Sequence, residues 1–279
     1  TGIYNTANGA SALYSNTIGQ YNTSTGVESL YSNSIGGGNT ANGWQSLYYN
    51  ISGGDNTVNG WQSMYKNSFG KENTANGVQS LYSNISGRDN TTTGFQSLVS
   101  NTMGNNNTAN GTYALYHNIT GNDNTAIGYY ADVSISSLSN ATAIGANAIV
   151  DASDKVRIGN SFVTVIEGQV AFTNPSDGRF KFNIKEDVAG LDFIMKLRPV
   201  TYNFDTQKQD DFVNGKITAG QLNNYMRPAS FNEGSFIRRT GFIAQEVEAA
   251  AKKTGYDFDG IKAPQNEKQY YSLSYASFV

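Results

Sequence analysis

The chain of 279 residues contains no cysteine, four prolines and a single histidine, and only 15% of its residues are charged. The absence of cysteine excludes disulfide bonds and metal–thiolate sites within this sequence. The net charge of −3 provides no basic stripe, so nucleic acid is a poor partner for it. No apolar run approaches the roughly 18 residues of a membrane span. Because the sequence starts at Thr1 and shows no signal-peptide pattern, we expect it to be part of a longer protein.

What the sequence does contain is a repeat of 17 residues. Each repeat starts with an Asn-Thr pair and has a glycine at its fifth position. The eight anchors are Asn5, Asn22, Asn39, Asn56, Asn73, Asn90, Asn107 and Asn124. A fixed period this short is typical of a solenoid in which each repeat forms one coil.

Each of the first seven repeats also contains a second asparagine and a second glycine, such as Asn16 and Gly19. Two Asn/Gly pairs per coil indicate two turns, because both residues accept positive φ at low cost. They also exclude helix, where each glycine would cost about 1 kcal/mol. Two short segments remain between the turns, Thr-Ala-x-Gly and Ser-Leu-Tyr, and both are predicted to be strands. The prediction is a parallel β-coil, and eight coils stacked about 4.8 Å apart give a rod roughly 40 Å long.

A coil this narrow is expected to hold only one row of side chains in its interior. The other apolar residues of each repeat then need a cover, and another copy of the same rod is the simplest one. We therefore predict a homotrimer around an axis that runs along the rod. The alternative is a monomeric β-solenoid, which usually requires longer coils and terminal caps.

The distribution of charge separates the repeats from the rest of the chain. Residues 1–140 hold 9 charged side chains, whereas residues 151–279 hold 32. We predict a β-roll repeat region at 1–150, a β neck or connector at 151–175 and a small α/β domain at 176–279. The fold class is therefore mainly β.

The C-terminal region shows patterns of both helix and strand. The expected elements are helices at 188–197 and 242–253, a strand at 200–204, and a polar loop with a short helix at 205–235. The second helix should bury Ile243, Val247 and Ala250, and Gly255 should end it. Alternating apolar residues predict short strands in the neck, from 155 to 170.

The repeats resemble the head repeats of trimeric autotransporter adhesins. The resemblance rests on the Asn-Thr-Ala-x-Gly coils, which lead into the segment Asn140-Ala-Thr-Ala-Ile-Gly-Ala-Asn-Ala148. In that family the head is a left-handed parallel β-roll of three chains around one axis. The same fold and the same trimer are therefore expected over about residues 1–150.

The C-terminal region resembles the intramolecular chaperone domain of phage endosialidase tail spikes and tail fibres. Three blocks carry the resemblance: Ser-Asp-Gly-Arg-Phe-Lys at 176–181, the segment 191–202, and Gly-Phe-Ile-Ala-Gln-Glu-Val at 241–247. The resemblance implies a domain that trimerises, helps a threefold fibre to fold and then cuts itself off. The family's Ser-Lys dyad falls on Ser176 and Lys181. The family's C-terminal coiled-coil helix would begin near 279, so we expect the domain to be truncated before it.

A Ser-Lys dyad of this kind implies a specific reaction. The Ser176 hydroxyl would attack the carbonyl carbon of Pro175, and the Lys181 amine would act as the base if burial lowered its pKa. Residues five apart point to opposite faces of a straight strand, so the pair can meet only where the chain bends. Gly178 permits that bend. The alternative is that Ser176 caps a turn and Lys181 is a solvated strand residue.

Other candidate sites lie in the repeats. Trp44, Trp61, Phe95 and Tyr129 share one repeat position and could form a sugar-binding stripe, although packing between chains is the alternative. The acidic residues Asp55, Asp89 and Asp123 share another position, where turn chemistry is expected rather than Ca²⁺ binding. His117 occupies a variable surface position and is expected to be neither a ligand nor a base.

These observations predict a trimeric extracellular fibre or adhesin, on a cell surface or on a virion or tail-like particle. Its role would be attachment to a surface through a glycan or protein receptor. The alternatives are a phage or phage-tail-like fibre that binds a host receptor, and a purely structural filament subunit. Any enzymatic activity would be a single autocatalytic cut at Pro175–Ser176, and no metal and no cofactor are expected.

Overall fold

The computed structural model describes residues 2–169, 175–213, 215, 216, 218, 237–267 and 269–278. The chain divides into two compact units, Thr1–Asn160 and Ser161–Val279. The boundary between the units lies inside the predicted connector at 151–175. In the described part of the chain, no helix has the length and apolar character that crossing a membrane would need.

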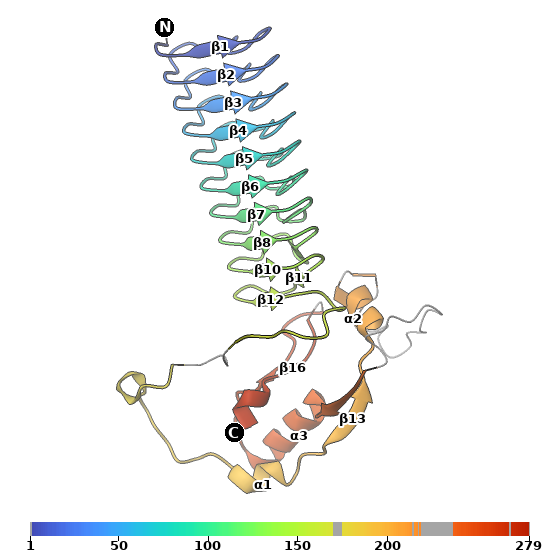
Figure 1. The fold of residues 1–279 in the computed structure, drawn as a ribbon. Coiled ribbons are helices and arrows are strands. Elements are labelled where there is room, and N and C mark those ends of the chain that lie inside the picture. Colours follow the sequence, from blue (N-terminus) through green and yellow to red (C-terminus); the bar gives the residue numbers. More distant parts are fainter. Residues whose placement is uncertain are drawn as a thin grey trace. The chain divides into compact units, whose positions relative to one another are not determined.

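The first unit is a parallel β-solenoid in which each coil contributes one short strand to a single sheet (Figure 1). The strands of this sheet are β1 (Thr6–Asn8), β2 (Thr23–Thr25), β3 (Thr40–Asn42), β4 (Thr57–Asn59), β5 (Thr74–Asn76), β6 (Thr91–Thr93), β7 (Thr108–Asn110), β8 (Thr125–Ile127), β10 (Thr142–Ile144) and β12 (Val156–Ile158). From β1 to β10, the first threonine of each strand in this sheet pairs with the first threonine of the next strand, 17 residues further on. The mainly β fold with 17-residue coils is confirmed.

The predicted second strand, Ser-Leu-Tyr, is wrong for most of the solenoid. In the third coil Gln45 and Leu47 have φ values of 54° and 53°, so the segment is a series of turns rather than an extended chain. Its backbone still bonds to the next coil, with the Leu47 N–H donating to Ser63 O at 3.0 Å. These bonds offset a left-handed conformation that costs roughly 1–2 kcal/mol per non-glycine residue. A second strand forms only near the end of the solenoid, where β9 (Asp132–Val133) pairs with β11 (Ile149–Val150).

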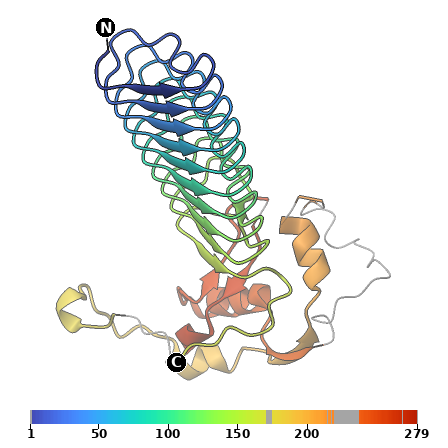
Figure 2. The same ribbon diagram turned by 45° about the horizontal axis from the view of Figure 1, so that its top comes forward.

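The interior of each coil holds more than the single row of side chains that the sequence suggested. The leucine of Ser-Leu-Tyr and the small residue of the strand are both buried, as at Leu47 and Ala41. Both asparagines of the repeat are buried as well, and each forms a ladder along the rod. In one ladder Asn73 Nδ2 donates to Asn56 Oδ1 at 3.1 Å and to Gly87 O at 2.9 Å. A coil therefore fills its own interior, half with apolar groups and half with paired amides. Figure 2, turned to look more nearly along the rod, shows that the backbone follows the same course in successive coils.

The asparagine ladders explain the second glycine of the repeat. At Gly70 an added Cβ would collide with Asn67 Oδ1, with Asn84 Nδ2 and with the carbonyl of Gly87. Only a residue without a side chain lets the amides of neighbouring coils approach this closely. The glycine is thus required by packing in the coil; the positive φ for which the sequence predicted it is not present at Gly70.

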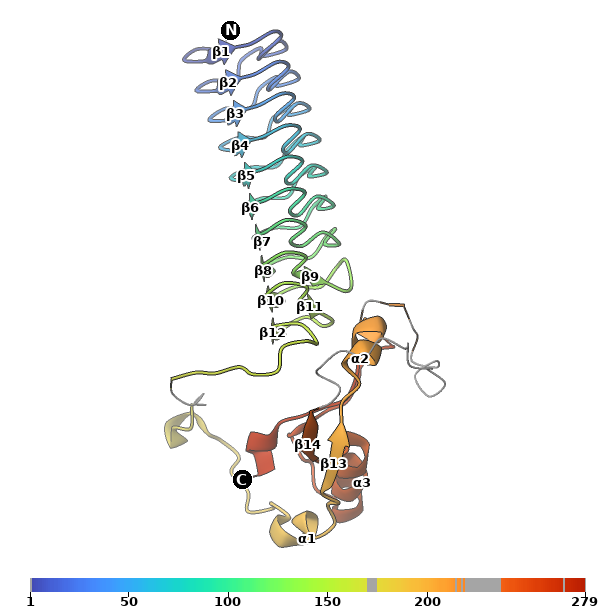
Figure 3. The same cartoon turned by 45° about the vertical axis from the view of Figure 1, so that its right-hand side comes forward.

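The second unit is a small α/β domain with two antiparallel strand pairs (Figure 3). Its elements are a 3₁₀ turn (Gly178–Phe180), α1 (Gly190–Ile194), β13 (Val200–Asn203), α2 (Thr206–Val213), β14 (Arg238–Gly241), α3 (Ala244–Thr254), β15 (Ile261–Lys262), β16 (Ser272–Leu273) and a 3₁₀ turn (Tyr275–Phe278). β13 pairs with β14, and β15 pairs with β16. The core contains Phe193, Val247, Ala250, Ala251 and Phe258.

Most of the expected C-terminal elements are present, with shifted ends. The strand predicted at 200–204 is β13. The second predicted helix is α3, which buries Val247 and Ala250 and ends at Gly255 with φ 65°. Ile243 was predicted to point inward but is 40% exposed, because it lies before the first turn of α3 with extended backbone angles. The first helix is shorter than predicted, since α1 begins at Gly190, whose φ is 51°.

Two other predictions are confirmed only in part. The short helix expected within 205–235 is α2, while residues 219–236 lie outside the described part of the chain. Of the neck strands expected from 155 to 170, only β12 forms, and it belongs to the solenoid sheet. No strand is present among residues 161–169.

Candidate functional site

The structure brings Ser176 and Lys181 together in the second unit. Lys181 Nζ lies 2.7 Å from Ser176 Oγ, a hydrogen-bonding distance. The intervening residues form the 3₁₀ turn Gly178–Phe180, in which the Lys181 N–H donates to Gly178 O at 3.2 Å. This turn is the bend that the five-residue spacing required. The two side chains are therefore within the reach that a serine nucleophile and a lysine base would require.

An ion pair lies inside the same turn. Asp177 precedes the turn, and its carboxylate accepts a hydrogen bond from the Arg179 N–H at 2.9 Å. The Arg179 guanidinium also contacts that carboxylate, with Nε 2.9 Å from Oδ2. The Arg179 hydrogen bonds hold the pKa of Asp177 below its ordinary value. The Asp177 carboxylate therefore favours its ionised form, and its exposed pair with Arg179 is screened by water and adds little to the stability of the turn.

Both members of the dyad lie on the surface of the chain. Their hydrogen bond is exposed, and the neighbouring side chains Phe180, Phe182 and Ile184 are 80%, 90% and 76% exposed. A lysine amine acts as a base only in its neutral form, which burial favours and water disfavours. In a single chain the two side chains are thus in contact, but the surrounding residues do not shield them from water.

The segment of the chain that contains this turn matches a known protein family. Residues 176–256 match the family model described as chaperone of endosialidase. The match starts at Ser176, so the first residue of the matched segment is the candidate nucleophile. The β-solenoid lies outside the matched segment. No curated protein and no solved structure gives a significant match to the chain.

The aromatic stripe predicted from the repeats is exposed on the solenoid. Trp44, Trp61, Phe95 and Tyr129 are 51%, 44%, 40% and 53% exposed. Trp44 and Trp61 stack on each other, with ring centroids 5.9 Å apart. Each ring therefore covers part of the other, and the remaining ring surface is what a ligand could contact. Sugar binding at this stripe remains a prediction.

Two further ladders were missed in the sequence, although the repeat positions reveal them. The tyrosine of Ser-Leu-Tyr stacks along the rod from Tyr14 to Tyr82, with centroids 5.0–5.2 Å apart. Gln62 Nε2 donates to Gln45 Oε1 at 2.8 Å, and the same bond continues from Gln79 to Gln62. The signal was a constant residue type at one position, which predicts contact between neighbouring coils.

The acidic position of the repeat holds one more carboxylate than the sequence analysis considered. Glu72 lies between Asp55 and Asp89 in the same position of consecutive coils. A hydrogen bond with Asp89 is the main cause that raises the pKa of Glu72. Among the described residues, no three or more His, Asp or Glu side chains are grouped so that they could hold a metal ion.

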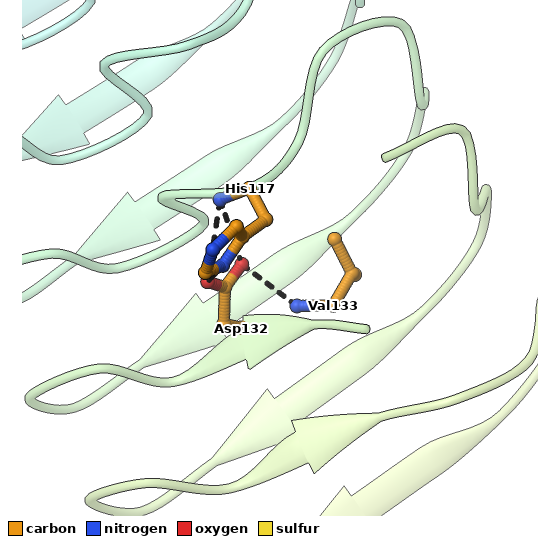
Figure 4. Close-up of polar contacts among 3 residues, drawn as sticks. All are labelled: His117, Asp132 and Val133. Atoms are coloured by element: carbon orange, nitrogen blue, oxygen red, sulfur yellow. Dashed lines mark hydrogen bonds and ion pairs between the residues drawn. The ribbon is translucent and has the colours of Figure 1, made fainter. Parts of the chain in front are cut away.

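His117 was predicted to be an unremarkable surface residue, but it has a specific partner. Its Nδ1 lies 2.7 Å from Oδ2 of Asp132, whose side chain is only 1% exposed (Figure 4). Asp132 also accepts hydrogen bonds from the backbone N–H of His117 and of Val133. It occupies the position that is Leu115 in the previous coil, and this break in the leucine column is the signal that was overlooked. The carboxylate caps backbone donors where the solenoid changes from the turn-rich coil to β9.

Stability of the solenoid near β9 is expected to fall as the pH rises past neutrality. The hydrogen bond with Asp132 is the main cause that raises the pKa of His117 above 6.5, so the folded state keeps a proton that the unfolded state has lost. The stabilisation is complete below the unfolded pKa and disappears as the pH rises through the folded one. Because the imidazole is 61% exposed, we expect less than about 1 kcal/mol.

Denaturant unfolding of the full chain between pH 5 and 9 measures this effect, with His117→Gln as the variant. The glutamine has no titrating group, so its stability should lack the decline above pH 6.5. The same decline in the wild type and in His117→Gln would contradict the assignment.

Proposed function

We propose that the chain is one subunit of a three-chain extracellular fibre that mediates attachment to a surface. The observation that carries this proposal is the combination of a β-solenoid with a segment that matches the chaperone of endosialidase. A chaperone of this family implies trimer formation and a tail-fibre-like chain. Its place would be outside the cell, on a bacterial surface or on a virion or tail-like particle.

The proposal includes one autocatalytic cut. The Ser176 Oγ attacks the carbonyl carbon of Pro175, and neutral Lys181 takes the hydroxyl proton. The bond between Pro175 C and Ser176 N breaks, an ester forms at Ser176 Oγ, and the freed α-amino group accepts a proton. Water then hydrolyses the ester, which releases the Pro175 carboxylate and restores the serine hydroxyl. The support is the contact of 2.7 Å between Lys181 Nζ and Ser176 Oγ.

The exposed aromatic stripe supports attachment rather than a purely structural role. Trp44 and Trp61 keep about half of their side-chain surface open. Large aromatic side chains dominate binding energy at recognition surfaces, and sugars stack on the faces of such rings. The ligand class that fits this stripe is a surface glycan or a protein receptor.

Native mass spectrometry of the full chain tests the assembly, and the mass of three chains is expected. The mass of a single chain would overturn the proposal.

Attachment is measured by binding of the labelled chain to bacterial cells, which the double variant Trp44→Ala/Trp61→Ala should weaken by about tenfold or more. Tyr14→Ala, which changes another exposed aromatic residue, is the matched control. Absence of binding by the wild type would favour the structural filament.

A further inference from the structure

One edge of the solenoid carries a large apolar side chain in every one of its first seven coils. The residue stands at one of the two positions before the second glycine of the repeat, and the other position holds serine or threonine. These residues are Ile18, Ile35, Ile51, Phe69, Ile85, Met103 and Ile119, and we call them the apolar ridge. Their side chains are between 41% and 59% exposed.

The apolar ridge has no role in the core of its own chain. The interior is already filled by Leu47 and its equivalents and by the asparagine ladders. The ridge is held rigidly, because the N–H of Ile35 and the N–H of Ser34 both donate to Ile51 O. Seven apolar side chains, divided between two adjacent repeat positions, are thus fixed along this edge in contact with water. A continuous apolar surface of this kind marks an interaction site, whereas scattered exposed apolar residues do not.

The presence of a large apolar residue in every coil of the ridge suits a partner that is itself a rod. Two straight rods can pack along their length only if the side chains between them keep one separation at every coil. The ridge keeps a large residue in every coil, and none of the four repeat positions from the second asparagine to the second glycine is charged in those coils. The aromatic stripe does not keep one size, because its position also holds Ala10, Val27 and Thr112.

A recess lies directly beside the ridge. Along the first four coils, a hollow of about 630 Å³ is lined by Ile18 and Ile35 of the ridge, by Gly37, Gly38 and Gly54, and by the polar residues Gln20, Tyr21, Ser52, Asp55 and Lys71. The glycines leave room where the other coils carry side chains. A threefold interface brings one surface of each copy against a different surface of the next, and in these coils the hollow is such a second surface beside the ridge.

We propose that the apolar ridge is the seam along which three parallel copies of this chain pack about the rod axis, with the ridges of the three copies facing that axis. The inference rests on the proposed trimer and adds which face is buried in it. Another copy is the occupant because only an identical rod repeats one apolar residue per coil at the same rise over seven coils. The aromatic stripe then faces outward and remains open to ligands.

The absence of cysteine in the chain makes a clean cross-linking experiment possible. Ile85 on the ridge and Trp61 on the aromatic stripe are both 44% exposed, so Ile85→Cys and Trp61→Cys are matched single-cysteine variants of the full chain. After reaction with a short bis-maleimide, Ile85→Cys is expected to give covalent dimers from up to roughly two thirds of the chains, since two of three thiols around the axis can be joined. Trp61→Cys is expected to stay uncross-linked.

Native mass and circular dichroism are measured first on each variant. A wild type with the mass of one chain overturns the proposed function itself. A chain that is trimeric but cross-links through Trp61→Cys, or through neither cysteine, overturns only the seam. If Ile85→Cys does not fold like the wild type, Ile51→Cys, at the same 44% exposure, replaces it.

Discussion

Replacing Ser176 with alanine is expected to leave the Pro175–Ser176 bond uncut in every chain. The variant has no hydroxyl to attack the Pro175 carbonyl, and loss of a catalytic nucleophile lowers the rate by a factor on the order of 10⁶. Denaturing mass spectrometry of the full chain measures the outcome. Wild type should give two fragments that meet at Ser176, and Ser176→Ala should give the intact mass.

The Lys181→Arg variant tests whether Lys181 acts as a base or has only a structural role. Arginine keeps the positive charge and can still donate a hydrogen bond to Ser176 Oγ, but it does not lose its proton in proteins. We expect this variant to remain uncut as well. Arg179→Ala is the matched control in the same turn, because it removes another exposed cation, which contacts Asp177 and not the serine. Cleavage of Lys181→Arg at the wild-type rate would contradict the role of Lys181 as a base.

Asn73→Ala is expected to have the largest effect on the stability of the solenoid. Asn73 Oδ1 accepts hydrogen bonds from the backbone N–H and the side-chain amide of Asn90, both at 3.0 Å. Its own amide donates to Asn56 Oδ1 and to Gly87 O, and the side chain is 1% exposed. Alanine leaves buried donors and acceptors without partners at about 1–3 kcal/mol each, so a loss of at least about 3 kcal/mol is expected.

The denaturant midpoint of the full chain measures this loss. Asn76→Ala, three residues further on, is the matched control. Asn76 is half-buried and accepts one side-chain hydrogen bond, from Asn59 Nδ2 at 2.7 Å. It should cost about 1 kcal/mol or less. Equal losses for the two variants would show that the buried ladder contributes no more than an ordinary surface amide.

Ser176 and Lys181 could be predicted as a pair because two kinds of information applied to one short segment. The resemblance to the chaperone domain indicated the two residues, and their spacing showed how they could meet. The spacing of Ser176 and Lys181 allowed contact across a bend at Gly178, and the structure has that bend and that contact. The pairing of His117 with Asp132 could not be predicted in the same way. Asp132 lies 15 residues after His117, not 17, so the repeat pattern places the two side chains in different positions of the coil.

The sequence by itself determined the solenoid, its 17-residue coil and the division from a C-terminal α/β domain. It could do so because every coil contacts its neighbours in the same way, so a strictly local repeat already contains the long-range contacts. Only the tertiary structure decided how the second half of each coil is built. The Ser-Leu-Tyr segment gains its hydrogen bonds from the next coil while Leu47 takes a left-handed backbone, and that cost is recovered by burial of the leucine. Such a balance between backbone strain and contacts with the next coil cannot be read from the residues of one repeat.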